Sequence, residues 1–149
     1  MPSSNEMQIR LFDESDQPSV IALWHQCGLL RPWNDPQLDI LRKQAVGAGL
    51  FLIGEMDGAL VASVMGGYDG HRGWMYYLAV SPVHQKLGLG AQIVQNLEKR
   101  LIAIGCPKIN LQVRRENDKV LRFYEKLGYN EDACLSLGKR LISDTPAVQ

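Results

Sequence analysis

Three strand-like runs follow one another along the middle of the chain, with only short turns between them. They cover residues 50–56, 59–67 and 74–80, and each is rich in β-branched, aromatic or other apolar residues. Asp57-Gly58 is a tight hairpin signal, and residues 68–73 form a longer polar turn. Connections this short allow only antiparallel pairing, because a parallel crossover needs about a dozen residues or more. The sequence therefore predicts an antiparallel meander at the centre of the fold.

The pattern changes after residue 80. Apolar residues recur at helical spacing up to Leu101, and Gly105 ends that helix before strand-like alternation over 109–113. A strand, a helix and a strand in this order predict a right-handed parallel crossover. A shorter helix over 117–127 and a final strand over 133–142 complete this half.

The first fifty residues predict a strand over 8–12, a helix from Ser15 or Asp16 to Gly28, and a weaker helix over 38–45. The whole order is β-α-α-β-β-β-α-β-α-β, which predicts one domain over residues 1–149 in the α/β (α+β) class. We expect a mixed, mostly antiparallel central sheet with one parallel β-α-β crossover and helices on both faces.

Composition excludes several classes of protein. Sixteen basic and sixteen acidic residues cancel, so nothing indicates a nucleic-acid or anionic-membrane partner. No apolar run approaches the roughly 20 residues of a membrane span. The three cysteines show no metal-ligand spacing, so we expect no metal site and reduced thiols in a cytoplasmic protein. Between residues 83 and 127, nine basic residues face four acidic ones, which fits either an ordinary surface or a mild attractor for a polyanionic small ligand.

The segment Gln85–Gly90 lies between a predicted strand and a predicted helix. The first turn of a helix has unpaired N–H groups and a partial positive charge, and Gly88 and Gly90 would let a phosphate approach them. Lys86 adds a charge nearby. The P-loop and dinucleotide-fold motifs are both absent. On this segment alone, a phosphate site and a simple turn stay equally open.

A second motif, NDKVLRFYEKLGY, begins at Asn117. Q-x-x-G-x-G after a strand ending in V-S-P, followed downstream by N-x6-Y-E-K-L-G-Y, resembles the GNAT superfamily of acetyltransferases. The resemblance extends to the order of elements over most of the chain. The segments RPWNDP and LSLGKRL are also similar to a bacterial subgroup of small GNAT proteins of the YpeA type.

The resemblance implies acetyl-CoA as co-substrate. Its pyrophosphate would bind backbone N–H groups of the glycine turn, its pantetheine arm would bind the preceding strand, and N–H near Leu78 would polarise the thioester carbonyl. The cofactor contacts implied are Leu78, Val80, Gln85, Lys86, Leu87, Gly88, Leu89, Gly90, Ala91 and Asn117. Tyr124, seven residues after Asn117, matches the tyrosine that protonates the departing thiolate; otherwise it is a tyrosine at the edge of the core.

The acceptor side is less well defined. Several relatives carry a glutamate on the strand before the turn, but residues 73–82 contain no carboxylate. Candidate bases are Glu55, Asp69, His71 or a water relayed by Tyr76. Five residues are candidates for acceptor binding: Trp33, Asn34, Asp35, Asp69 and Arg72. Asp35 could attract a cationic amine, but the Asn-Asp-Pro sequence around it favours an ordinary helix start.

These observations lead to one main hypothesis, an N-acetyltransferase in which an amine attacks the thioester directly. The alternatives are a regulatory module that binds acyl-CoA without turnover and an interaction domain whose glycine turn binds nothing. The acceptor is open among a small amine, a peptide N-terminus and a lysine side chain. Exposed edge strands would allow a homodimer.

Overall fold

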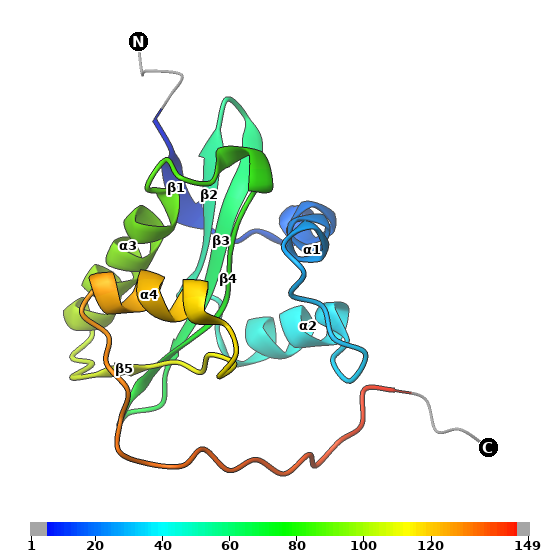
Figure 1. Ribbon diagram of the computed structural model, residues 1–149. Coiled ribbons are helices and arrows are strands. Elements are labelled where there is room, and N and C mark those ends of the chain that lie inside the picture. Colours follow the sequence, from blue (N-terminus) through cyan, green and yellow to red (C-terminus); the bar gives the residue numbers. More distant parts are fainter. Residues whose placement is uncertain (1–5, 146–149) are drawn as a thin grey trace.

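A computed structural model describes residues 6–145 (Figure 1). Its elements, in chain order, are β1 (Gln8–Leu11), η1 (Glu14–Asp16), α1 (Gln17–Gln26), α2 (Pro36–Val46), β2 (Phe51–Met56), β3 (Ala59–Tyr68), β4 (Gly73–Val80), η2 (Pro82–His84), α3 (Leu89–Ala103), β5 (Ile109–Asn110) and α4 (Asp118–Lys126). No helix in this part of the chain combines the length and apolar character that a membrane crossing requires.

The five strands form one sheet in the order β1-β2-β3-β4-β5. The first three pairings are antiparallel, which confirms the predicted meander. The turn between β2 and β3 forms because Asp57 and Gly58 both adopt positive φ angles, 52° and 77°, as a two-residue hairpin requires. β4 pairs with β5 in parallel, as predicted for the crossover through α3.

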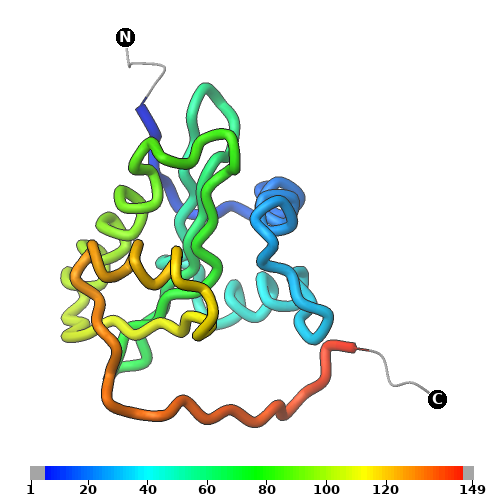
Figure 2. The backbone as a smooth tube through the Cα atoms, in the orientation of Figure 1, coloured from blue at the N-terminus to red at the C-terminus, as the bar shows by residue number. Residues whose placement is uncertain are grey.

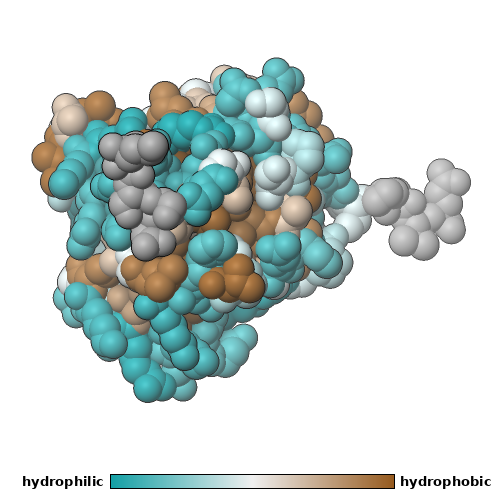
Figure 3. All heavy atoms as spheres, turned by 90° about the horizontal axis from the view of Figure 1, so that it is seen from above, coloured by the Kyte–Doolittle hydropathy of each residue, from teal (hydrophilic) through white to brown (hydrophobic). Residues whose placement is uncertain are grey.

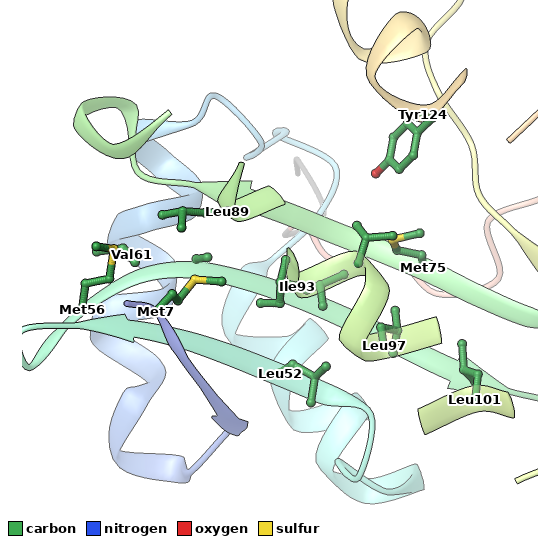
Figure 4. Close-up of a cluster of buried hydrophobic side chains, with 13 residues drawn as sticks. Met7, Leu52, Met56, Val61, Met75, Leu89, Ile93, Leu97, Leu101 and Tyr124 are labelled. Carbon is green, nitrogen blue, oxygen red and sulfur yellow. The ribbon is translucent and has the colours of Figure 1, made fainter. Parts of the chain in front are cut away.

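Helices cover both faces of the sheet, so the predicted fold class is confirmed. Figure 1 shows α1 and α2 on one side of the strands and α3 and α4 on the other, and Figure 2 shows the same chain path. Each face has its own apolar core. One core lies beneath α3 and α4 (Figure 4), and the other packs Trp24 and Ile40 of α1 and α2 against Phe51 and Ile53. The surface seen in Figure 3 is mostly hydrophilic with separate apolar groups, as expected for a globular chain.

The predicted final strand over 133–142 is wrong. This segment has no strand pairing and runs along the outside of the fold toward α2 (Figures 1 and 2). Side chains rather than a backbone ladder attach the segment that begins at residue 131: Asp132 accepts hydrogen bonds from Lys108 and Asn110, and Asp144 pairs with Arg42 at 2.8 Å. Its leucines are exposed to solvent, with Leu137 at 91% exposure, because no described element packs over them.

The strand predicted over 109–113 is shorter in the structure. β5 contains only Ile109 and Asn110, which pair with Gly73 and Trp74. Beyond Asn110 the chain leaves β4, although the alternation of apolar residues continues. Periodicity alone therefore overestimated this strand, because a ladder also needs a neighbour at the right distance.

Leu97 of α3 packs closely on β3, since a Cβ added to Gly66 would lie 2.5 Å from its Cδ1 atom. Leu97 is fully buried, and we expect Leu97→Ala to lower the free energy of unfolding by about 2–5 kcal/mol. The control on the same helix is Ile102→Ala. Ile102 is 70% exposed, so its loss should change stability by about 0.5 kcal/mol or less. Urea unfolding measures both, and equal losses would contradict the packing described.

Candidate functional site

A large cleft opens where β4 and the chain after β5 separate. Its volume is about 1140 Å³. Its walls come from β4, the turn into α3, the segment after β5, α4, and residues of α2 and the loop before it. A cleft of this size holds a ligand larger than most small metabolites.

An irregularity in β4 begins at the centre of this cleft. Ser63 pairs with Ala79 and Met65 with Tyr76, so Tyr77 and Leu78 together face the single residue between Ser63 and Met65. Such a bulge bends a strand and re-aims its side chains. Tyr77 takes a positive φ of 52°, which is uncommon outside glycine. β4 therefore changes direction beyond the two residues that pair with β5, and the cleft opens there.

The glycine turn lies at one end of the cleft. Gly88 precedes α3 in the left-handed conformation, with a φ of 78°, and no side chain caps the helix. Gly88, Leu89, Gly90 and Ala91 all line the cleft. The N–H groups of this first turn are thus available to an anion, and the helix dipole favours a negative charge there.

Positions 88 and 90 favour glycine for different structural reasons. A Cβ on Gly88 would meet no atom within 4 Å, so its positive φ is what favours glycine. A Cβ on Gly90 would lie 3.1 Å from Cζ of Phe123, so this glycine lets α3 approach α4. The Gln85 side chain donates a hydrogen bond to the Val80 carbonyl at 3.1 Å, which holds the turn against the end of β4. Of the two glycines, only Gly88 therefore has open space beside it that a ligand could occupy.

Most positions assigned to the cofactor lie along this cleft. Those in its lining are Leu78, Val80, Gln85, Lys86, Gly88, Leu89, Gly90, Ala91 and Asn117, together with Tyr124. Leu87 does not line it and is 58% exposed. Asn117 precedes α4 without a capping hydrogen bond from its side chain, so its amide is available to a ligand.

Tyr124 extends from α4 toward the sheet (Figure 4). Its ring is buried between Phe123 and Tyr129, which meet it edge-on at centroid distances of 5.1 and 5.6 Å. Burial raises the pKa of Tyr124 to about 12, and no hydrogen bond within residues 6–145 contributes to the shift. The phenol is therefore neutral at physiological pH and has a proton to donate into the cleft.

The wall of the cleft that α2 contributes contains a carboxylate that the sequence analysis missed. Asp39 of α2 accepts a hydrogen bond from the Tyr77 hydroxyl at 2.5 Å. The Tyr77 ring stacks on Trp24 at 3.9 Å, and burial followed by the Asp39 hydrogen bond raises the pKa of Tyr77. A signal was present in the sequence, because Asp39, Arg42 and Lys43 share one helical face by their i, i+3 and i+4 spacing.

The residues expected to bind the acceptor lie in different places. Asn34 lines the cleft, whereas Trp33, Asp35, Asp69 and Arg72 do not. Asp35 caps α2 by accepting hydrogen bonds from the N–H groups of Gln37 and Leu38. Asp69 accepts those of His71 and Arg72 in its turn. The ring of Trp33 lies under the Arg114 guanidinium, 5.5 Å from its centroid.

The candidate bases are likewise dispersed. Glu55 pairs with Arg10 across β1 and β2, at the far edge of the sheet. Asp69 and His71 lie in the turn between β3 and β4, outside the cleft lining. Tyr76 does line the cleft and is half exposed. Within the described residues, Asp39 is the one carboxylate in the lining.

Comparison with known proteins gives a consistent result. The family model described as Acetyltransferase (GNAT) family matches residues 12–129. An acetyltransferase of Pectobacterium atrosepticum is 54% identical over 138 residues, covering 93% of this chain and 98% of the relative. One from Yersinia enterocolitica is also 54% identical, with the same coverage. The assignment to the YpeA-type subgroup stays a prediction.

Solved structures share the fold at lower sequence identity. Ard1 from Thermoplasma volcanium is 23% identical with a TM-score of 0.77, covering 85% of this chain and 84% of its own. The ribosomal-protein-S18-alanine N-acetyltransferase from Escherichia coli is 19% identical with a TM-score of 0.73. The match covers 86% of this chain and 80% of the Escherichia coli enzyme. The family match and the identity to curated acetyltransferases show that this chain belongs to the GNAT family of acetyltransferases.

Proposed function

We propose that this protein transfers the acetyl group of acetyl-CoA to an amine by direct attack. GNAT proteins generally use acetyl-CoA, and the arrangement of one cleft supports the same use here. The glycine turn lies at one end of this cleft, Tyr124 lines its wall, and Asp39 belongs to the lining contributed by α2. That combination is the observation on which the proposal rests.

The residues along the cleft fit the chemical groups of acetyl-CoA. The uncapped N–H groups of α3 and the open space at Gly88 suit a pyrophosphate, and Lys86 and Lys119 add positive charge to the same lining. Leu78 and Val80 of β4 offer backbone groups to the pantetheine arm, and Asn117 offers its amide. When bound, acetyl-CoA supplies an acetyl group activated as a thioester.

Tyr124 is the proton donor in this proposal. As the carbon–nitrogen bond forms and the carbon–sulfur bond breaks, its hydroxyl proton would pass to the sulfur of the departing thiolate. The proton that the nitrogen loses would return through solvent to the phenolate and restore the phenol. A phenol with a pKa of about 12 is a weak acid toward an ordinary thiolate, whose thiol has a pKa near 8.5. The same burial disfavours a charged sulfur, however, and so raises the basicity of the thiolate in the cleft. The two pKa values therefore approach each other in the dry site.

Asp39 is the group that we propose orients the amine. Its carboxylate is partly exposed, with 23% of the side-chain surface accessible, and it is fixed by the Tyr77 hydroxyl. It can accept a hydrogen bond from the attacking nitrogen. A positioned amine reacts faster because its orientational entropy has already been lost on binding. Tyr77 thus acts as a positioning residue through Asp39.

Binding of acetyl-CoA should stabilise the folded protein. Acetyl-CoA at about a hundredfold excess over its Kd should stabilise the protein by about 2.7 kcal/mol, seen as a rise in Tm. Gly88→Ala should weaken this shift, because its methyl group would project into the cleft. The variant should also lose about 1–2 kcal/mol of stability from its left-handed backbone.

Gly128→Ala is the matched control for this experiment. Gly128 has a positive φ of 94° and open space around its Cα, but it does not line the cleft. It should lose similar stability and keep the full acetyl-CoA shift. No shift for the unmodified protein at millimolar acetyl-CoA would contradict the proposal, and a shift without turnover of any amine would favour the alternative acyl-CoA-binding module.

Removing the Tyr124 hydroxyl tests the proposed proton donor. Tyr124→Phe should lower kcat by about a hundredfold, the usual effect of losing a general acid. It should leave acetyl-CoA binding and folding nearly intact, since no hydrogen bond within the described residues contributes to the pKa of this hydroxyl. Release of free thiol measures the rate. Tyr68→Phe, which removes a phenol outside the cleft, should have no effect on the rate. An unchanged single-turnover rate in Tyr124→Phe would exclude its role as donor.

The buried phenol of Tyr124 should make the stability of the fold depend on pH. Burial raises the pKa of Tyr124 from 10.0 to about 12, so the folded state retains this proton where the unfolded state has lost it. The resulting stability is complete below pH 10 and is lost as the pH rises toward 12. Between these pH values Tyr124→Phe should lose less unfolding free energy than the unmodified protein. Urea unfolding at stepped pH measures this difference. If both proteins lost unfolding free energy equally, burial would not raise the pKa of Tyr124.

A further inference from the structure

The part of the cleft lined by α2 has more positive than negative charge. Its lining includes Arg31, Arg42 and Lys43, against the single carboxylate of Asp39. Arg42 lies 3.7 Å from Asp39 and pairs with Asp144 at 2.8 Å, so both of these carboxylates already have a cation. Within residues 6–145, Arg31 and Lys43 form no ion pair. Two cations are thus left without an anion.

Lys43 is the more informative of the two. Its side chain is half buried, and burial lowers its pKa with no carboxylate to offset the effect. A Cβ on Gly67 would lie 3.3 Å from Nζ, so the ammonium lies over β3 at a position where there is no side chain. Burying an unpaired ammonium costs free energy. The Lys43 ammonium is therefore a partly buried charge that no carboxylate of the described residues neutralises.

The position of Lys43 also separates it from the glycine turn. Gly67 pairs with Trp74, six residues before Val80 at the other end of β4. At about 3.3 Å per residue, that is roughly 20 Å along the strand. The pyrophosphate proposed for the turn leaves Lys43 without a partner. An anion at Lys43 must therefore come from another part of the bound molecules.

Asp39 and Lys43 are four residues apart on α2 and so share one face of the helix, with Cβ atoms about 6 Å apart. They do not pair with each other: Asp39 binds Tyr77, and Lys43 extends toward Gly67. One wall of the cleft thus presents a carboxylate and a separate ammonium. A small molecule with an amine and an anionic group a few bonds apart would match both.

We propose that the acceptor carries an anionic group, a carboxylate or a phosphate, in addition to its amine. The anion binds Lys43, and the amine lies at Asp39. This inference rests on the proposed acetyl transfer and narrows its acceptor to compounds of the amino acid or amino-phosphate type.

The test uses matched pairs of amines. β-Alanine and longer ω-amino carboxylates are compared with their amides, and phosphoethanolamine is compared with ethanolamine. Thiol release from acetyl-CoA gives kcat/KM for each compound. The anionic member of a pair should exceed its neutral partner by about tenfold to a hundredfold, the usual effect of a hydrogen bond to a charged group. The carboxylate and phosphate arms distinguish the two sources of the anion.

Lys43→Met tests the residue itself. It should abolish the preference for the anionic member while leaving rates with the neutral member and the acetyl-CoA thermal shift unchanged. Its Tm should stay the same or rise, because an unpaired ammonium has been removed. Lys43→Arg should keep part of the preference. Lys99→Met, an exposed lysine of α3 outside the cleft, is the control and should retain the preference in full.

The outcomes separate the two proposals. Turnover with equal or better rates for the neutral amines, or equal slowing of every amine by Lys43→Met, overturns the anionic acceptor and leaves acetyl transfer standing. An acetyl-CoA shift with no turnover of any amine, or no shift at all, overturns acetyl transfer and the acceptor inference with it. A preference that depends on Lys43 supports both.

Discussion

The brief contact between β4 and β5 is the constraint on which the rest of the molecule depends. Only Gly73 and Trp74 of β4 pair with β5, and the bulge at Tyr77 and Leu78 follows three residues later. Beyond these points a continuous sheet would have filled the space that the cleft occupies. The backbone groups of β4 that would have completed the ladder face a cavity instead. An extended ligand can pair with such groups as a strand would, which is why this irregularity suits a long flexible arm.

The bulge also connects the two faces of the sheet. On the α1–α2 face, Tyr77 is held by the Trp24 ring and by Asp39, and Trp24 is fixed by a hydrogen bond to Ser63, the buried polar residue of β3. On the other face, Tyr124 packs within the apolar core beneath α3 and α4. The two candidate chemical groups therefore belong to separate cores. Each core fixes its own group, and both groups line the cleft that opens between β4 and the chain after β5.

Much of this fold follows from local signals, but the acceptor end of the site does not. The Asp57-Gly58 hairpin, the helix start at Asp35 and the turn at Gly88 each depend on backbone preferences that a few neighbouring residues determine. The segment 133–142 alternates like a strand, yet it has no ladder, because pairing depends on a distant neighbour. Lys43 and Asp39 look like any charged pair on a helix. Only the packing of α2 against β3 and β4 shows that one faces Gly67 and the other binds Tyr77.

The partial burial of Lys43, rather than the number of basic residues, is what makes its charge informative about a ligand. The chain as a whole is neutral, and the basic excess over residues 83–127 includes exposed side chains that solvent and salt screen. Lys43 lies outside that stretch, and its charge is held partly away from water beside a carboxylate that is already paired. An exposed lysine can remain unpaired at little cost, whereas a half-buried one lacks both its full hydration and an anion. The missing interaction is one that a ligand can supply, and the ligand that does so must bring its negative charge to the α2 end of the cleft.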